Sequence, residues 1–104
     1  MTSPRSTVSA LQRLQQWYKS QCDGDWEHSY GISIGTVDNP GWSVEIDLAD
    51  TPLQYKSFTE VKRDYEDETE WITCFLRDGK FIGACGPEKL EKMLEIFLDW
   101  TKDS

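Results

Sequence analysis

The feature that most constrains the fold is a β-hairpin signal, the pair Asp78-Gly79 between two apolar runs at residues 70–77 and 80–85. Aspartate followed by glycine is typical of a two-residue turn, because both turn positions require positive φ. A turn of two residues also fixes the register of the strands on either side. The two runs are therefore expected to form adjacent antiparallel strands, with Leu76 opposite Phe81.

A second hairpin is predicted from alternating apolar residues at 30–35 and 42–48. Matching the apolar faces of the two runs pairs Ile34 with Val44 and leaves a five-residue loop at 37–41, which is a permitted hairpin length. The opposite face of this hairpin is then small and acidic. On it we expect Ser33 to lie beside Glu45 and Gly31 beside Asp47.

Amphipathic helices are expected on both sides of these strands. Residues 7–22 carry apolar side chains at helical spacing, with Ser6 or Thr7 as the N-cap, and Gly86-Pro87 is typical of a second helix start. Residues 56–65 are a weaker strand candidate. This order predicts an α+β fold, in which an antiparallel sheet of four to five strands, six at most, carries the N-terminal and C-terminal helices on one face.

The length and charge of the chain limit the number of domains and the classes of ligand. The 104 residues are enough for one domain, taken as 1–104 with a core of about 7–102, and the formal net charge is −8. This charge argues against nucleic acid as a direct ligand, which requires clustered lysine and arginine. No apolar run is long enough for a signal peptide or a membrane span, so we expect a cytoplasmic protein with no membrane partner. The oligomeric state is not predicted.

The sequence offers little for catalysis, metal or cofactor binding. Three cysteines, Cys22, Cys74 and Cys85, lack C-x-x-C spacing, and glycine motifs for phosphate are absent. In the predicted register Cys74 and Cys85 are diagonal neighbours about 7–8 Å apart, beyond disulfide reach, which indicates reduced thiols. His28 is the only histidine, and its spacing from Cys22 does not support a thiol nucleophile with its base. No catalytic residue, cofactor or metal site is predicted.

The unusual feature of this sequence is that tryptophan residues lie beside acidic residues. Trp17, Trp42 and Trp100 continue apolar stripes and are interpreted as core residues, whereas Trp26 follows no stripe and is expected in a loop. Tryptophan is enriched at protein interfaces. The cluster at residues 66–70 is interpreted as a solvated turn. The candidate partner-binding residues are the acids near small or aromatic side chains, with one tryptophan: Asp23, Asp25, Trp26, Glu27, Glu45 and Asp47.

Several of these segments resemble a known family. The block at residues 21–28, preceded by Trp17-Tyr18 and followed by the turn at 38–42 and by Gly86-Pro87, is similar to the immunity protein 53 family of bacterial polymorphic toxin systems. The resemblance covers about residues 11–100. It implies a small α+β protein, encoded beside a toxin that it binds and neutralises in the producing cell. It supplies no enzymatic residues.

Three functions remain open at this point. A cognate toxin, for example a basic nuclease, is the partner that the resemblance implies, and an acidic face would speed its encounter with the protein. An acidic adaptor or nucleic-acid mimic that binds many basic proteins is the second reading. A small hydrolase that uses Cys22 or paired acids is the third.

Overall fold

The computed structural model describes residues 9–63 and 66–102 of the chain. These residues form five strands and three helices. The strands are β1 (Ile32–Val37), β2 (Gly41–Asp47), β3 (Val61–Arg63), β4 (Ile72–Arg77) and β5 (Lys80–Cys85), and the helices are α1 (Ala10–Gln21), α2 (Trp26–Ser29) and α3 (Leu90–Lys102). The predicted α+β class is confirmed.

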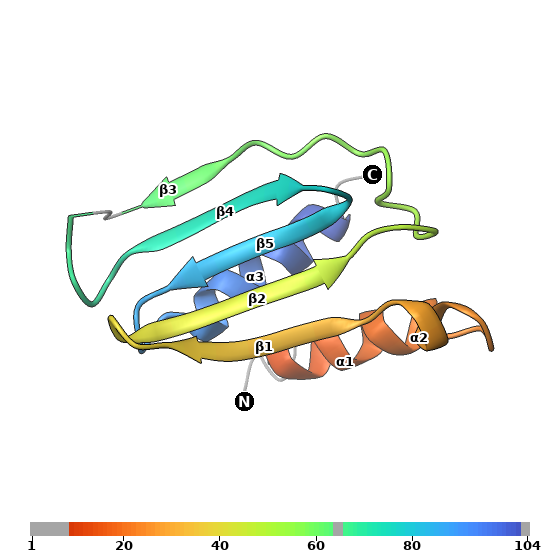
Figure 1. Ribbon diagram of the computed structural model, residues 1–104, viewed down its shortest axis with the longest axis horizontal. Coiled ribbons are helices and arrows are strands. Elements are labelled where there is room, and N and C mark those ends of the chain that lie inside the picture. The colour runs from red at the N-terminus through yellow and green to blue at the C-terminus, as the bar shows by residue number, and fades with distance from the viewer. Residues whose placement is uncertain (1–8, 64–65, 103–104) are drawn as a thin grey trace, which may run out of the picture.

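The strands form a single antiparallel sheet in the order β1-β2-β5-β4-β3. The two predicted hairpins, β1–β2 and β4–β5, lie side by side because β2 pairs with β5. The short strand β3 joins the outer side of β4, so that β1 and β3 are the two edges of the sheet (Figure 1).

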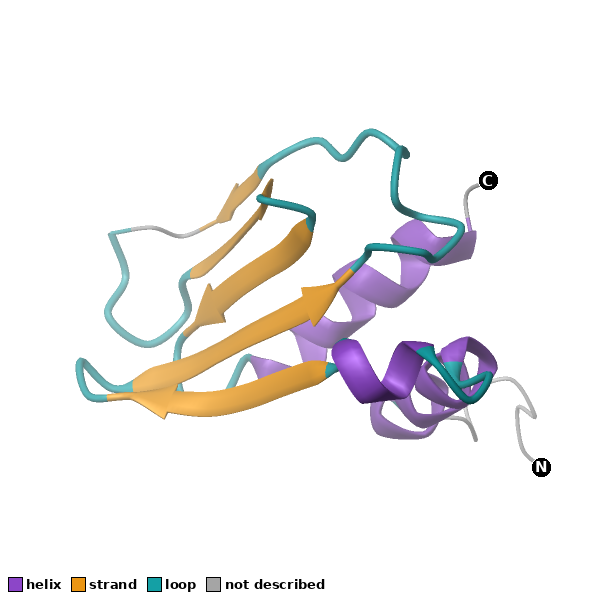
Figure 2. Ribbon diagram, turned by 45° about the vertical axis from the view of Figure 1, so that its right-hand side comes forward, coloured by secondary structure: helices purple, strands orange, loops and turns teal. Residues whose placement is uncertain are grey.

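Helices α1 and α3 lie on the same face of the sheet, which we call the inner face (Figure 2). Helix α3 packs against β5 and against α1, and the side chains between these elements form the core. The largest fully buried side chains there come from β2, β5 and α3 and from the residue just after β2: Phe81, Phe97, Ile46, Leu48, Met93 and Val44. No described element covers the opposite, open face. None of the helices in residues 9–63 and 66–102 is long and apolar enough to cross a membrane.

A glycine of β5 lies where the Met93 side chain of α3 packs on the sheet. A Cβ atom built at Gly83 of β5 would lie 2.6 Å from the Met93 Sδ atom of α3, closer than real Cβ atoms approach other atoms. The absence of a side chain at this position therefore makes room for the buried Met93 side chain against the strand, which is one recognised use of glycine in a strand interior.

The predicted registers are confirmed in both hairpins. Ile34 lies opposite Val44, and Leu76 lies opposite Phe81 across the Asp78-Gly79 turn. The connection between β1 and β2 is shorter than predicted, because Val37 and Gly41 also pair and leave only residues 38–40 as the turn.

The helix starts differ from the prediction. Helix α1 is capped by Ser9, whose Oγ accepts from the Gln12 backbone N–H at 3.2 Å while Gln12 Oε1 accepts from the Ser9 N–H at 3.1 Å. This reciprocal capping box replaces the expected cap at Ser6 or Thr7, which lie outside the described residues. Helix α3 begins at Leu90 and not at Pro87, because residues 86–89 form a separate turn.

The weaker strand candidate at 56–65 is largely wrong. Only residues 61–63 form strand β3, and residues 56–60 run as an irregular segment. Residues 64 and 65 lie outside the described part of the chain. In the described part of this segment, Val61, Lys62 and Arg63 pair with Cys74, Thr73 and Ile72 of β4, and the apolar side chains of the segment fall out of strict alternation.

All three cysteines are free thiols, as predicted. Cys74 and Cys85 are buried on the inner face, and burial raises the pKa of Cys74 to about 12 and that of Cys85 to about 11. Cys22 is partly buried and ends α1 as its C-cap.

Candidate partner-binding surface

The acidic segment between α1 and β1 is folded by its own carboxylates. Asp23 Oδ1 accepts hydrogen bonds from the backbone N–H groups of Asp25 and Trp26, both at 3.0 Å. The Glu27 carboxylate reaches back to accept from the N–H groups of Asp23 at 3.0 Å and Gly24 at 2.9 Å. Two of the predicted site residues are therefore also local structural groups.

These hydrogen bonds stabilise the ionised carboxylates. The N–H groups of Trp26 and Asp25 lower the pKa of Asp23, and backbone N–H groups, first its own and then those of Asp23 and Gly24, lower the pKa of Glu27. Both side chains thus keep a negative charge at neutral pH. Asp25 makes no capping hydrogen bond to the helix α2 that follows it, and it is exposed.

Trp26 does not lie in a loop, and the expectation that it does is wrong. It is the first residue of α2 and is only 4% exposed. Its Nε1–H donates to the Ala49 carbonyl oxygen at 2.9 Å, and its ring meets those of Trp17 and Tyr18 edge-on at centroid distances of 6.1 and 6.0 Å. The indole holds the segment to α1 and to the turn after β2, and little of its surface faces solvent.

A hollow of about 310 Å³ opens beside this indole, and its walls come from the 23–30 segment and from the turn after β2. We call it the acidic hollow, lined by Asp23, Asp25, Trp26, Ser29, Tyr30 and Asp50. Asp50 was not among the predicted residues; it lies three residues after Asp47 and twenty after Tyr30, so its place beside the 23–30 segment depends on the fold. Its positive φ of 61° marks the turn that brings it there.

Glu45 and Asp47 lie on the open face of β2, since their neighbours Val44 and Ile46 are buried on the inner face. Lys80 of β5 approaches both carboxylates, at 3.7 Å from Glu45 and 3.8 Å from Asp47. Asp47 Oδ2 also accepts the Gly31 N–H at 2.9 Å. The predicted neighbourhood of these two acids with small residues of the first strand is confirmed by the register.

The structure brings both predicted acid groups to the start of β1. Tyr30, which lines the acidic hollow, directly precedes Gly31, whose N–H binds Asp47. The predicted site residues thus lie on two sides of one short segment. Which of them contact a partner remains a prediction.

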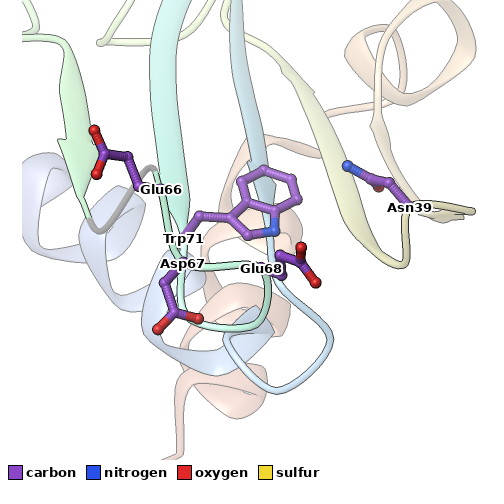
Figure 3. Close-up of a pocket in the computed structure, with 5 residues that line it drawn as sticks. All are labelled: Asn39, Glu66, Asp67, Glu68 and Trp71. Carbon is purple, nitrogen blue, oxygen red and sulfur yellow. The ribbon is translucent and has the colours of Figure 1, made fainter.

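A third acidic group, at residues 66–68, shares a hollow with Trp71, which was not among the predicted site residues. Trp71, just before β4, lines a hollow of about 520 Å³ together with Asn39, Glu66, Asp67 and Glu68 (Figure 3). Asn39 reaches this hollow from the turn between β1 and β2. Asp67 Oδ1 accepts the N–H groups of Thr69 at 2.8 Å and Glu70 at 3.0 Å, so the cluster is also a folded turn. The adjacency of Glu70 and Trp71 was its one signal in the sequence.

Cys22 and His28, the thiol and imidazole considered for catalysis, have different surroundings. Cys22 Sγ donates to the Tyr18 carbonyl oxygen at 3.3 Å, and His28 is exposed in the last turn of α2. In the described residues no hydrogen bond joins the two side chains, and no three His, Cys, Asp or Glu side chains are grouped so that they would hold a metal ion.

Most of the chain matches a known protein family. The family model described as Immunity protein 53 matches residues 11–102, which is most of the chain. Searches of the curated proteins and of the solved structures find no match.

Proposed function

Because the chain belongs to the Immunity protein 53 family, we propose that it binds a cognate toxin of a bacterial polymorphic toxin system and neutralises it in the cytoplasm of the producing cell. The match over residues 11–102 is the observation that carries this proposal. The acidic linings of two surface hollows agree with a protein that binds a basic partner.

The proposed docking surface is the acidic area at the start of β1. It comprises the predicted acids Asp23, Asp25, Glu27, Glu45 and Asp47, together with Asp50. Trp26 supports this area from beneath. If the toxin is a nuclease, its substrate groove is basic, and complementary charge raises the association rate and the specificity of the encounter.

Coexpression tests the function directly. The toxin domain encoded beside this gene is expected to arrest growth when produced alone, and coexpression of this protein is expected to restore growth. Failure to rescue, with both proteins soluble, would refute the proposal. Equal, salt-sensitive binding to unrelated basic proteins would instead favour the acidic-adaptor reading.

A matched pair of charge reversals tests the surface. Asp25→Lys places a cation at the acidic hollow, whereas Glu60→Lys makes the same change of net charge at an exposed position before β3, at the other edge of the sheet. We expect Asp25→Lys to weaken toxin binding about tenfold or more, mainly through a slower association rate, and Glu60→Lys to change it far less. Equal losses would indicate that only net charge matters, and unchanged binding in Asp25→Lys would place the interface elsewhere.

A further inference from the structure

Strand β1 is an edge strand whose outer backbone groups are unpaired within the described residues. Gly31 O accepts the Asp47 N–H at 3.0 Å, while Leu48 N–H donates to Gly79 O on the other side of β2. Hydrogen bonding alternates along an antiparallel pair, so this pattern points the backbone N–H and C=O groups of Ser33 and Gly35 toward β2. It turns the N–H and C=O groups of Ile32, Ile34 and Thr36 outward, where no described strand lies.

This edge lacks the features that usually prevent strand pairing. Its six residues, Ile-Ser-Ile-Gly-Thr-Val, contain no charge and no proline. Ile34 is 41% exposed. The opposite edge, β3, is three residues long and carries Lys62 and Arg63. Short length and basic side chains are common protections of an edge strand. The sheet is thus protected at one edge and open at the other.

An apolar groove lies beside the open edge. A hollow of about 350 Å³ between α1 and the start of β1 is lined by Leu14, Gln15, Tyr18, Gly31 and Ile32. Of the four large hydrophobic side chains exposed in the described residues, Leu11, Tyr18 and Ile34 belong to α1 or β1. Figures 1 and 2 both show α1 running beside β1 on the inner face. The edge therefore offers backbone groups and an apolar pocket together.

The other side of this edge is small and acidic. Ser33 and Gly35 face the open side, and a Cβ built at Gly35 would meet only Ser43 Oγ, at 3.9 Å. Glu45 lies directly opposite Ser33 on the next strand. Long basic side chains of an added strand would therefore have room to extend over β1 toward Glu45, while alternate side chains would point into the apolar groove.

We infer that the cognate toxin docks by adding an extended segment to β1, with apolar side chains in the α1–β1 groove and alternate lysine or arginine side chains over Ser33 and Gly35. The inference rests on the proposed function and names the mode of binding. Main-chain hydrogen bonds to Ile32, Ile34 and Thr36 would supply affinity, and the groove with the acids would supply specificity. A second copy of this chain fits less well, because its own β1 has no basic side chain to offer.

Amide hydrogen exchange of the full chain, followed by NMR with and without an inactivated form of the toxin domain encoded beside the gene, tests this inference. We expect exchange of the outward amides of Ile32, Ile34 and Thr36 to slow about tenfold or more on binding. A complex that leaves these three rates unchanged would overturn the inference while the proposed function stands. Absence of any complex would refute both, and slowing that appears with protein concentration alone would assign the edge to a second copy.

A pair of variants at one position supplies the control. Thr36→Pro removes an outward N–H at an exposed edge position, where proline is tolerated, and Thr36→Val keeps the N–H and the β-branched shape. We expect toxin binding to weaken about tenfold or more in Thr36→Pro and to stay at the wild-type level in Thr36→Val. Equal affinity of the two folded variants would overturn the inference. If Thr36→Pro does not fold, the exchange rates of the wild-type protein decide.

Discussion

Replacing Trp26 separates a structural role from a binding role at the proposed surface. Its side chain is 4% exposed, donates a hydrogen bond to Ala49 and packs against Trp17, Tyr18 and Tyr30. Trp26→Ala removes the indole and leaves space between α1, α2 and the turn after β2. Toxin affinity is therefore expected to fall through loss of the folded protein, and only secondarily through lost contacts.

The size of the effect follows from burial. Truncation of a buried tryptophan to alanine costs about 3–5 kcal/mol, from lost transfer free energy and the cavity that remains. Trp26→Phe keeps most of the ring but loses the 2.9 Å hydrogen bond to Ala49 O, which contributes about 1 kcal/mol. The phenylalanine variant should therefore retain most of the stability that the alanine variant loses.

Urea unfolding followed by far-UV circular dichroism measures both variants against Tyr55→Ala, a control at a side chain that is 91% exposed. With a slope of about 1–2 kcal/mol per molar for a chain of this size, Trp26→Ala should lower the midpoint by about 2 M or more. Tyr55→Ala should change the free energy of unfolding by less than about 0.5 kcal/mol. A stable Trp26→Ala protein with strongly weakened toxin binding would refute this reasoning and make the indole a direct contact.

Three further predictions concern packing, pH and thiols. Gly83→Ala should lower the free energy of unfolding by about 1–3 kcal/mol, measured in urea, because its Cβ would lie 2.6 Å from the Sδ atom of the buried Met93; an unchanged midpoint would show that the Met93 side chain adjusts at little cost. Because the pKa of Asp23 is lowered in the folded state from its ordinary value of 3.8, its contribution to stability is present above the unfolded pKa and lost as pH falls through the folded one. Thermal melts should show a smaller acid loss in Asp23→Asn than in the wild type, and parallel curves would contradict the assignment. At pH 8, Ellman's reagent should label Cys22 rapidly and reach Cys74 and Cys85 only after unfolding, since their pKa values are raised to about 12 and about 11; rapid labelling of all three would contradict their burial.

The hairpins were predictable because their determinants are local. A period of two assigns each side chain to a face, and the Asp78-Gly79 turn then fixes the register of β4 and β5. The pairing of β2 with β5, which joins the two hairpins, depends on contacts between distant segments and left no local signal. Because that pairing decides which strands are edges, the open edge at β1 became visible only in the structure.

Trp26 shows the same limit at the level of one residue. It follows no apolar stripe in sequence because its neighbours come from α1, from Tyr30 just after α2 and from the turn after β2. Apolar periodicity in the sequence indicates which residues lie on the buried face of one helix or strand. It gives no sign of a residue that is buried among several elements. Its interpretation as a loop residue failed for that reason, while Trp17, Trp42 and Trp100 continue stripes and do pack in or against the core.

The acids of the proposed surface differ in the hydrogen bonds and ion pairs that they already make within the protein. Asp23 and Glu27 already accept two backbone N–H groups each, so a partner that took these oxygens would have to compete with the fold of the segment. Asp25 makes no capping bond, and Glu45 is exposed with only a 3.7 Å approach from Lys80, an interaction worth little at a solvated surface. Asp25 and Glu45 can therefore engage a basic partner at the smallest internal cost, and they lie on the two sides of the start of β1. Charge complementarity is consequently expected to act next to the open edge, where the backbone of β1 is also free to pair.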